Sequence, residues 1–159
     1  MKAKILLLSF LGISILSNAQ PLATTFEDAE STGISISKLD DTYPSAAHYE
    51  PEKGVFKERQ PEFLKSYVNM HQELGKYLTQ NGFNWPKTTQ LFTRVYFDSS
   101  GTIDYFLINP KKANLDEGEI ELYFRLLNEF IKDYKLPISA SSGFAQCSPI
   151  KYVSKKKDN

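Results

Sequence analysis

Two stretches in which apolar residues recur at helical spacing flank a stretch in which they alternate, and this order constrains the fold most strongly. The first stretch begins near Pro61, which suits the first turn of a helix, and ends at Asn81 and Gly82, which favour helix termination. The stripe expected to be buried comprises Phe63, Tyr67, Met70, Leu74 and Leu78. The pattern therefore predicts an amphipathic helix ahead of the alternating stretch.

The alternating stretch predicts a β-hairpin. Residues 91–97 are rich in β-branched and aromatic residues, and residues 102–108 are expected to form the return strand. The turn at 98–101 ends in Gly101, a residue type that adopts positive φ without steric cost. Asn109 and Pro110 then end the second strand.

A second helix and a last strand follow. Asn114 or Asp116 can cap this helix, and Pro137 prevents its continuation. Its expected buried stripe comprises Ile120, Phe124, Leu127, Phe130 or Ile131, and Tyr134. Residues 144–153 predict a strand in which Pro149 cannot donate to a ladder, so this strand lies at an edge or is bulged. The order α-β-β-α-β predicts an α+β domain with both helices on one face of a small antiparallel three-stranded sheet.

The N-terminus has the features of a cleavable secretory signal peptide. Lys2 and Lys4 give a basic start, residues 5–16 carry no charge, and Ala19 precedes a suitable cleavage position before Gln20. A membrane-spanning helix needs about 20 apolar residues, so the uncharged run is too short for an anchor. We expect cleavage near Ala19, export to the periplasm or the medium, and no integral membrane segment afterwards.

The stretch after the signal peptide is poor in large apolar residues, so it is expected to be a loosely attached arm. Within it, residues 34–37 alternate and could instead form a short edge strand. The expected organisation is a signal peptide at 1–19, a flexible polar arm or linker at 20–53, an α+β domain at 54–153 and a basic tail at 154–159.

Charge and cysteine content exclude several functional classes. The chain has 19 Lys and Arg against 19 Asp and Glu, and loss of Lys2 and Lys4 leaves the mature part slightly acidic. This balance does not point to nucleic acid as a partner. Cys147 is the only cysteine, so no internal disulfide can form and the apolar core must hold the domain.

The hairpin and its neighbours resemble a known family. Residues 93–108, Thr-Arg-Val-Tyr-Phe-Asp-Ser-Ser-Gly-Thr-Ile-Asp-Tyr-Phe-Leu-Ile, look like the central hairpin of TonB C-terminal-like domains, in which a strand ends in Asp and the turn carries Gly. The helix at 118–134 and the segment 148–152, Ser-Pro-Ile-Lys-Tyr, are similar to the helix and the final strand of that family. The resemblance covers residues 60–153.

The resemblance implies the family's fold and its mode of contact, in which a partner's peptide extends the edge of the sheet. Energy transducers of this family are held in the inner membrane by an N-terminal helix and cross the periplasm on a long Pro-rich linker. This chain has a short signal peptide instead, and only Pro21, Pro44 and Pro51 precede the first predicted helix. The resemblance therefore does not extend to coupling with an inner-membrane motor.

We expect a non-enzymatic module that binds a protein partner of the cell envelope through the edge of the last strand, with no cofactor or metal. The candidate edge residues are Gln146, Ser148, Ile150, Lys151, Tyr152 and Val153. Proline at Ile150 is expected to abolish binding by removing an edge donor. A weaker candidate surface on the face of the sheet comprises Phe92, Arg94 and Tyr96. Pairing of two copies through their edges is a further alternative.

Two other functions stay open. A small periplasmic thiol-dependent hydrolase would use Cys147 with His48 or His71, although a lone strand cysteine is more often a small buried residue. An assembly factor would instead fold its arm, residues 20–53, on a partner. The two histidines lack the spacing of a zinc site, and the helix dipole accounts for the acidic cluster at 117–121.

Overall fold

The computed structural model describes residues 20–154, and both the predicted signal peptide and most of the predicted basic tail lie outside the described residues. Its centre is a mixed sheet of four strands in the order β1-β3-β2-β4. The strands are β1 (Leu22–Thr25), β2 (Thr89–Phe97), β3 (Ile103–Asn109) and β4 (Phe144–Tyr152). Strand β2 pairs antiparallel with both β3 and β4, whereas β1 pairs parallel with β3. The predicted α+β class is confirmed, and the sheet has one strand more than expected.

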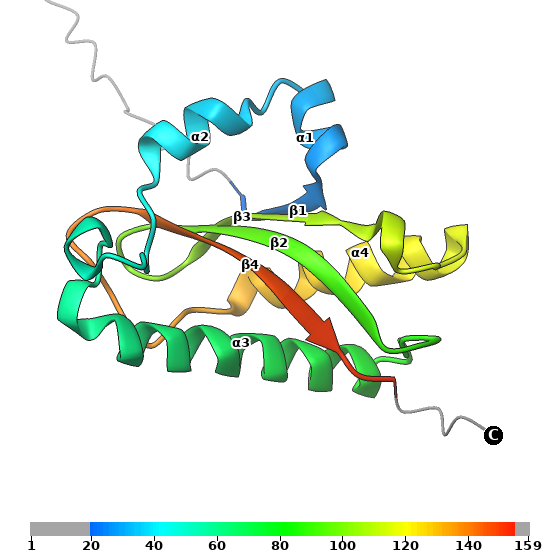
Figure 1. Cartoon of the computed structure of the whole chain (residues 1–159). Helices are drawn as coiled ribbons and strands as arrows, with labels where there is room; N and C mark the ends of the chain where they lie inside the picture. Colours follow the sequence, from blue (N-terminus) through cyan, green and yellow to red (C-terminus); the bar gives the residue numbers. More distant parts are fainter. Residues whose placement is uncertain (1–19, 155–159) are drawn as a thin grey trace, which may run out of the picture.

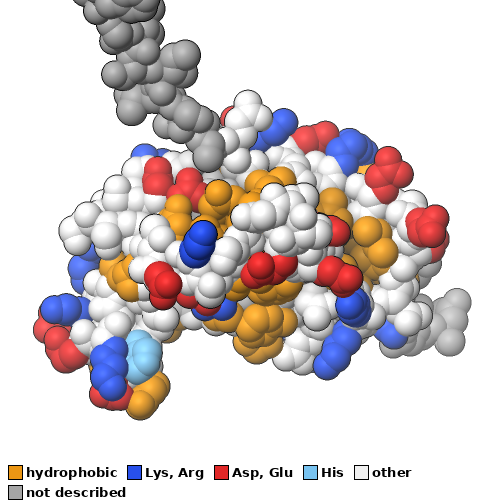
Figure 2. All heavy atoms as spheres, turned by 90° about the horizontal axis from the view of Figure 1, so that it is seen from above, with side chains coloured by type: hydrophobic (Ala, Val, Ile, Leu, Met, Phe, Trp, Pro, Cys, Tyr) orange, Lys and Arg blue, Asp and Glu red, His pale blue; other side chains and the backbone are white. Residues whose placement is uncertain are grey.

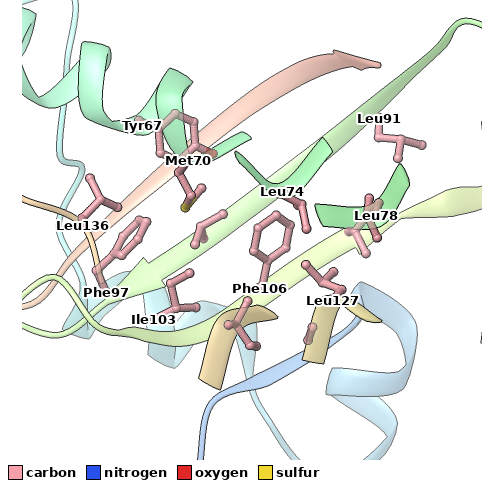
Figure 3. Close-up of a cluster of buried hydrophobic side chains, with 14 of the residues drawn as sticks. Tyr67, Met70, Leu74, Leu78, Leu91, Phe97, Ile103, Phe106, Leu127 and Leu136 are labelled. Atoms are coloured by element: carbon pink, nitrogen blue, oxygen red, sulfur yellow. The ribbon is translucent and has the colours of Figure 1, made fainter. Parts of the chain in front are cut away.

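Two long helices, α3 (Gln60–Gln80) and α4 (Glu117–Asp133), cover one face of the sheet (Figure 1). All five residues of the predicted α3 stripe are buried. Figure 3 shows Tyr67, Met70 and Leu74 of α3 facing the sheet side chains of the main core. This packing holds α3 against the sheet, next to β4.

The buried face of α4 is only partly as predicted. Asp116 caps the helix, because its carboxylate accepts a hydrogen bond from the Glu119 backbone N–H at 2.8 Å. The fully buried side chains of the helix are Tyr123, Leu126, Leu127 and Ile131. The predicted Ile120, Phe124, Phe130 and Tyr134 are half-buried. Tyr123 is buried instead, and its ring packs against Phe83 and Trp85 of the loop that precedes β2.

Gly101 closes the hairpin between β2 and β3 with φ of 91°. The Asp98 carboxylate accepts hydrogen bonds from the backbone N–H groups of Ser100 and Thr102 at 2.8 and 2.9 Å. A Cβ atom at Gly101 would lie 2.7 Å from the Ile138 carbonyl oxygen, so both backbone conformation and space require glycine here.

The expectation of a flexible arm at 20–53 is wrong. This segment contains β1, the helices α1 (Phe26–Ser31) and α2 (Ile36–Thr42) and the 3-10 turn η1 (Pro51–Lys53), and a second 3-10 turn, η2 (Lys57–Arg59), leads into α3. Helices α1 and α2 lie on the face of the sheet opposite α3 and α4, so the helices are not confined to one face (Figure 1). The alternating residues 34–37 do not form a strand, since α2 begins within them.

The order in this segment comes from a second, smaller apolar cluster. Ala29 is fully buried against Tyr96, Leu107 and Ala145 of the sheet. The side chains that complete the cluster from outside are Phe26, Ile34, Ile36, Leu39, Tyr43 and Tyr105. The arm was expected because ordering a segment with few large apolar residues costs conformational entropy, and burial of this apolar surface offsets that cost. Within residues 20–154 no helix combines the length and apolarity needed to cross a membrane.

Candidate partner-binding edge

Strand β4 forms one edge of the sheet, as predicted. One flank pairs with β2 along the whole strand, from Phe144 opposite Phe97 to Tyr152 opposite Thr89. On the other flank, the Ala145 N–H donates to the Pro44 carbonyl at 2.9 Å, and the Ala145 carbonyl accepts from the Ala46 N–H at 2.7 Å. No other part of the described chain pairs with this flank, so the edge is open after Ala145.

The backbone groups that point outward follow from this bridge. In an antiparallel ladder, alternate residues direct both their N–H and C=O groups to the same neighbour. The pairing of β4 with β2 has no register shift, and Ala145 points away from β2. Cys147, Pro149 and Lys151 therefore point outward as well, while Ile150 points toward β2. Pro149 sits where its missing N–H removes no ladder hydrogen bond.

This alternation corrects the expectation for proline at Ile150. The Ile150 N–H belongs to the ladder with Leu91 of β2, so a proline there would damage the sheet rather than the open edge. The outward N–H groups belong to Cys147 and Lys151. Replacement of Lys151 is therefore the direct way to remove an edge donor.

Several predicted edge side chains are engaged inside the chain. The Ser148 hydroxyl donates to the Tyr67 hydroxyl at 3.1 Å, and the buried Tyr152 hydroxyl lies 3.1 Å from His71 Nδ1. The Gln146 amide accepts from the Ala47 N–H at 3.2 Å. Ile150 is half-buried, whereas Lys151 and Val153 are exposed, so these last three are the predicted residues that a partner can reach.

A groove of about 470 Å³ lies beside this edge, between β4 and the C-terminal half of α3. Its outer residues on the helix are Val68, Gln72, Gly75, Lys76 and Thr79. The rings of His71, Trp85 and Tyr152 also line it, and Trp85 stacks on Tyr152 with ring centroids 4.9 Å apart. This groove was not predicted from the sequence, where the available signals were Val68, which lies off the predicted apolar stripe, and Gly75, which lies within the predicted helix.

The inner wall of the groove is uncharged. Burial lowers the pKa of His71 to about 3, so this imidazole is neutral at physiological pH. Burial also raises the pKa of Tyr152 well above its ordinary value, which keeps its hydroxyl protonated. His71 Nε2 and Trp85 Nε1 are buried and have no hydrogen-bond partner among residues 20–154.

The weaker candidate surface on the face of the sheet is mostly covered. Tyr96 is fully buried, and its hydroxyl donates to Asp40 of α2 at 3.0 Å. Arg94 pairs with the same carboxylate at 2.7 Å. Only Phe92 is exposed, at 47%. Figure 2 looks onto this side of the molecule and shows charged side chains of both signs among the apolar ones, without one dominant charge.

Within residues 20–154, no hydrogen bond joins the Cys147 thiol to either histidine of the hydrolase alternative. Cys147 pairs with Arg94 on the face that carries α2, and burial raises the pKa of its thiol. His71 lies on α3 at the other face, beside Tyr152. His48 Nδ1 accepts from the Glu50 N–H at 3.0 Å. No group of three or more metal-binding side chains is assembled in the described part of the chain.

Comparison with known proteins gives no assignment to set beside this geometry. The chain matches no protein-family model. No curated protein and no solved structure matches it either. The resemblance to TonB C-terminal-like domains therefore stays a prediction, and the open edge and its groove have to be interpreted from their own chemistry.

Proposed function

We propose that the protein is an exported, non-enzymatic module of the cell envelope that binds a partner protein by taking up an extended segment at the open edge of β4. The partner segment becomes a further strand beyond β4, and main-chain hydrogen bonds supply much of the affinity. After removal of the signal peptide, the module acts in the periplasm or outside the cell. The resemblance of residues 93–108 and 148–152 to TonB C-terminal-like domains favours the same mode of contact.

The observation that carries the proposal is the row of outward backbone groups after Ala145 that no other strand of the described chain pairs with. Among them, the Cys147 carbonyl accepts a hydrogen bond from the Gln146 side-chain amide at 3.1 Å. Exposed edges are templates for pairing, and proteins usually cover them or protect them with charge. Within residues 20–154, backbone pairing covers this edge only at Ala145, through the segment that contains Pro44 and Ala46. Lys151 is the single charged side chain on the open part, so the edge keeps both donors and acceptors accessible.

The test is cross-linking capture with the mature chain, residues 20–159, as bait in envelope extract, followed by mass spectrometry. Lys151→Pro removes the outward N–H, whereas Lys151→Gln keeps it and serves as the matched control. Circular dichroism and thermal unfolding establish that both variants are folded.

We expect one partner to be captured by the native chain and by Lys151→Gln, and to be lost with Lys151→Pro. Equal capture by the folded proline variant would exclude strand addition at this edge. A native chain that captures no specific partner would count against the binding function as a whole.

A further inference from the structure

We infer that the groove between α3 and β4 selects the added strand by its side chains. It takes an extended partner segment in which a bulky aliphatic residue has an acidic residue two positions away. This inference rests on the proposed function and names the chemistry of the partner. Three features of the groove support it: exposed apolar walls, an open floor and a lysine without an ion-pair partner in the described chain.

The walls of the groove expose apolar surface. Val68 on α3 is 51% exposed and Val153 after β4 is 69% exposed, and they are two of the five exposed large apolar side chains in the described chain. Strand β4 runs obliquely over α3 toward the helix C-terminus (Figure 1). A strand added beyond β4 would therefore place its inward side chains against the flank of α3 and cover Val68.

The floor of the groove is open because residue 75 is glycine. Gly75 lies inside α3, where glycine is less stable than alanine by about 1 kcal/mol. A Cβ atom added to Gly75 would have nothing within 4 Å, so packing does not require glycine at this position. The missing side chain instead leaves space in a groove of about 470 Å³, a volume typical of ligand pockets.

The helix side of the rim carries a positive charge. Lys76 lines the groove and is exposed, and it belongs to no ion pair with another residue of the described chain. Lys151 alternates with the inward Ile150 and Tyr152, so its side chain lies on the opposite face of β4 and does not add to this charge. A carboxylate on the partner complements the Lys76 ammonium group. Since side chains of a strand alternate between faces, an acidic residue two positions from the aliphatic residue shares its face.

The neighbouring edge favours a peptide over a hydrocarbon chain. The outward N–H and C=O groups of β4 need hydrogen-bond partners, which a peptide backbone brings and a lipid tail does not. A second copy of β4 is disfavoured, because residues 144–152 contain no acidic residue that could pair with Lys76.

The test uses synthetic peptides and the fluorescence of Trp85, the only tryptophan of the chain, which lines the groove. The first peptide is Thr-Asp-Thr-Leu-Thr-Asp-Thr, because alternating threonine favours an extended chain. The second, Thr-Thr-Asp-Leu-Asp-Thr-Thr, has the same composition but places its acidic residues on the face opposite leucine. In the third, alanine replaces the leucine of the first.

We expect the first peptide to change the Trp85 emission and to bind at least about tenfold more tightly than the other two. Gly75→Leu fills the groove and should abolish this binding while making the helix more stable. Gly118→Leu on α4 replaces a second helical glycine, which is exposed and lies away from the groove, so this matched control should bind as the native chain does.

A charge exchange tests the rim separately. Lys76→Glu should lower the affinity for the first peptide and raise the affinity for a version in which lysine replaces both aspartates. Lys132→Glu on α4 should leave the order of affinities unchanged. Equal affinity for the first three peptides, or unchanged binding by Gly75→Leu, would overturn the inference. If the native chain binds all three peptides equally and Lys151→Pro binds none of them, strand addition at the edge is supported and only the inferred side-chain preference is wrong.

Discussion

The carboxylate of Asp40 lies 2.7 Å from the guanidinium of Arg94 and joins helix α2 to strand β2 across the outer face of the sheet. The Tyr96 hydroxyl donates to the same carboxylate at 3.0 Å. Nearby, the Tyr43 hydroxyl donates to Asp104 at 2.8 Å. These polar contacts surround the smaller apolar cluster, so α1 and α2 are held to the sheet by both kinds of interaction.

Asp40→Asn should destabilise the protein by about 1–3 kcal/mol, because it leaves Arg94 partly buried without its charged partner. Both side chains of the pair are about one third exposed or less, so solvent screening lowers this figure only in part. Urea unfolding measures the change, with the exposed neighbour variant Asp41→Asn as control. If the two variants were equally stable, the Asp40 pair would contribute nothing to holding α2.

The helix α3 and the hairpin could be predicted because their signals are local. The stripe from Phe63 to Leu78 repeats within one helix, and Gly101 marks a turn between neighbouring strands. By contrast, β1 pairs in parallel with β3, so its partner lies far along the chain, and no local pattern marks Leu22–Thr25 as a strand. The face covered by α1 and α2 was missed for the same reason.

The candidate site was predictable only in outline. Pro149 correctly placed the last strand at an edge, because a proline inside a central strand would interrupt a ladder. Which groups point outward depends on the bridge from Ser45 to Ala145, and that contact joins distant segments. The groove depends on how β4 crosses α3, so neither Gly75 nor Lys76 could be linked to the edge from sequence.

Burial of His71 should make stability depend on pH. In the folded chain burial lowers the pKa of His71 to about 3, whereas the unfolded side chain titrates near its ordinary pKa of 6.5. The unfolded state therefore binds a proton that the folded state does not, and stability declines as the pH falls from about 6.5 toward 3. Between pH 7 and 5 this effect is about 2 kcal/mol.

Urea unfolding at pH 7 and pH 5 checks the role of His71. His71→Gln should lose this part of the pH dependence, whereas His48→Gln should retain it. Since carboxyl groups also titrate in acid, the comparison is made between variants at the same two pH values. A decline of the same size in His71→Gln and in the native chain would show that another group causes it.

Gly101→Ala should destabilise the hairpin by about 2–4 kcal/mol. The new Cβ atom would lie 2.7 Å from the Ile138 carbonyl oxygen, and residue 101 would also have to keep a φ of 91°. Gly82→Ala is the control, because Gly82 has φ of 89° but nothing lies within 4 Å of its added Cβ. We expect about 1 kcal/mol for Gly82→Ala, and equal losses would mean that the close carbonyl can move away.

Proline at two adjacent positions of β4 should have very different effects on stability. Ile150→Pro removes an N–H from the ladder with Leu91 and should cost about 3 kcal/mol, because a buried carbonyl on β2 loses its donor. Lys151→Pro removes an N–H that points outward, so its cost should be about 1 kcal/mol or less. Lys151→Gln should lie within about 0.5 kcal/mol of the native chain.

Guanidinium unfolding of the three variants, without any partner present, tests this order directly. The alternation of β4 follows from the outward bond of Ala145 and from an unshifted register with β2, so it fixes which proline is harmful. The reverse order, with Lys151→Pro the more damaging, would place the Lys151 N–H in the ladder. The open edge would then offer the N–H groups of Ile150 and the other even-numbered residues. Ile150→Pro, not Lys151→Pro, would then be the variant that removes an edge donor in the capture experiment.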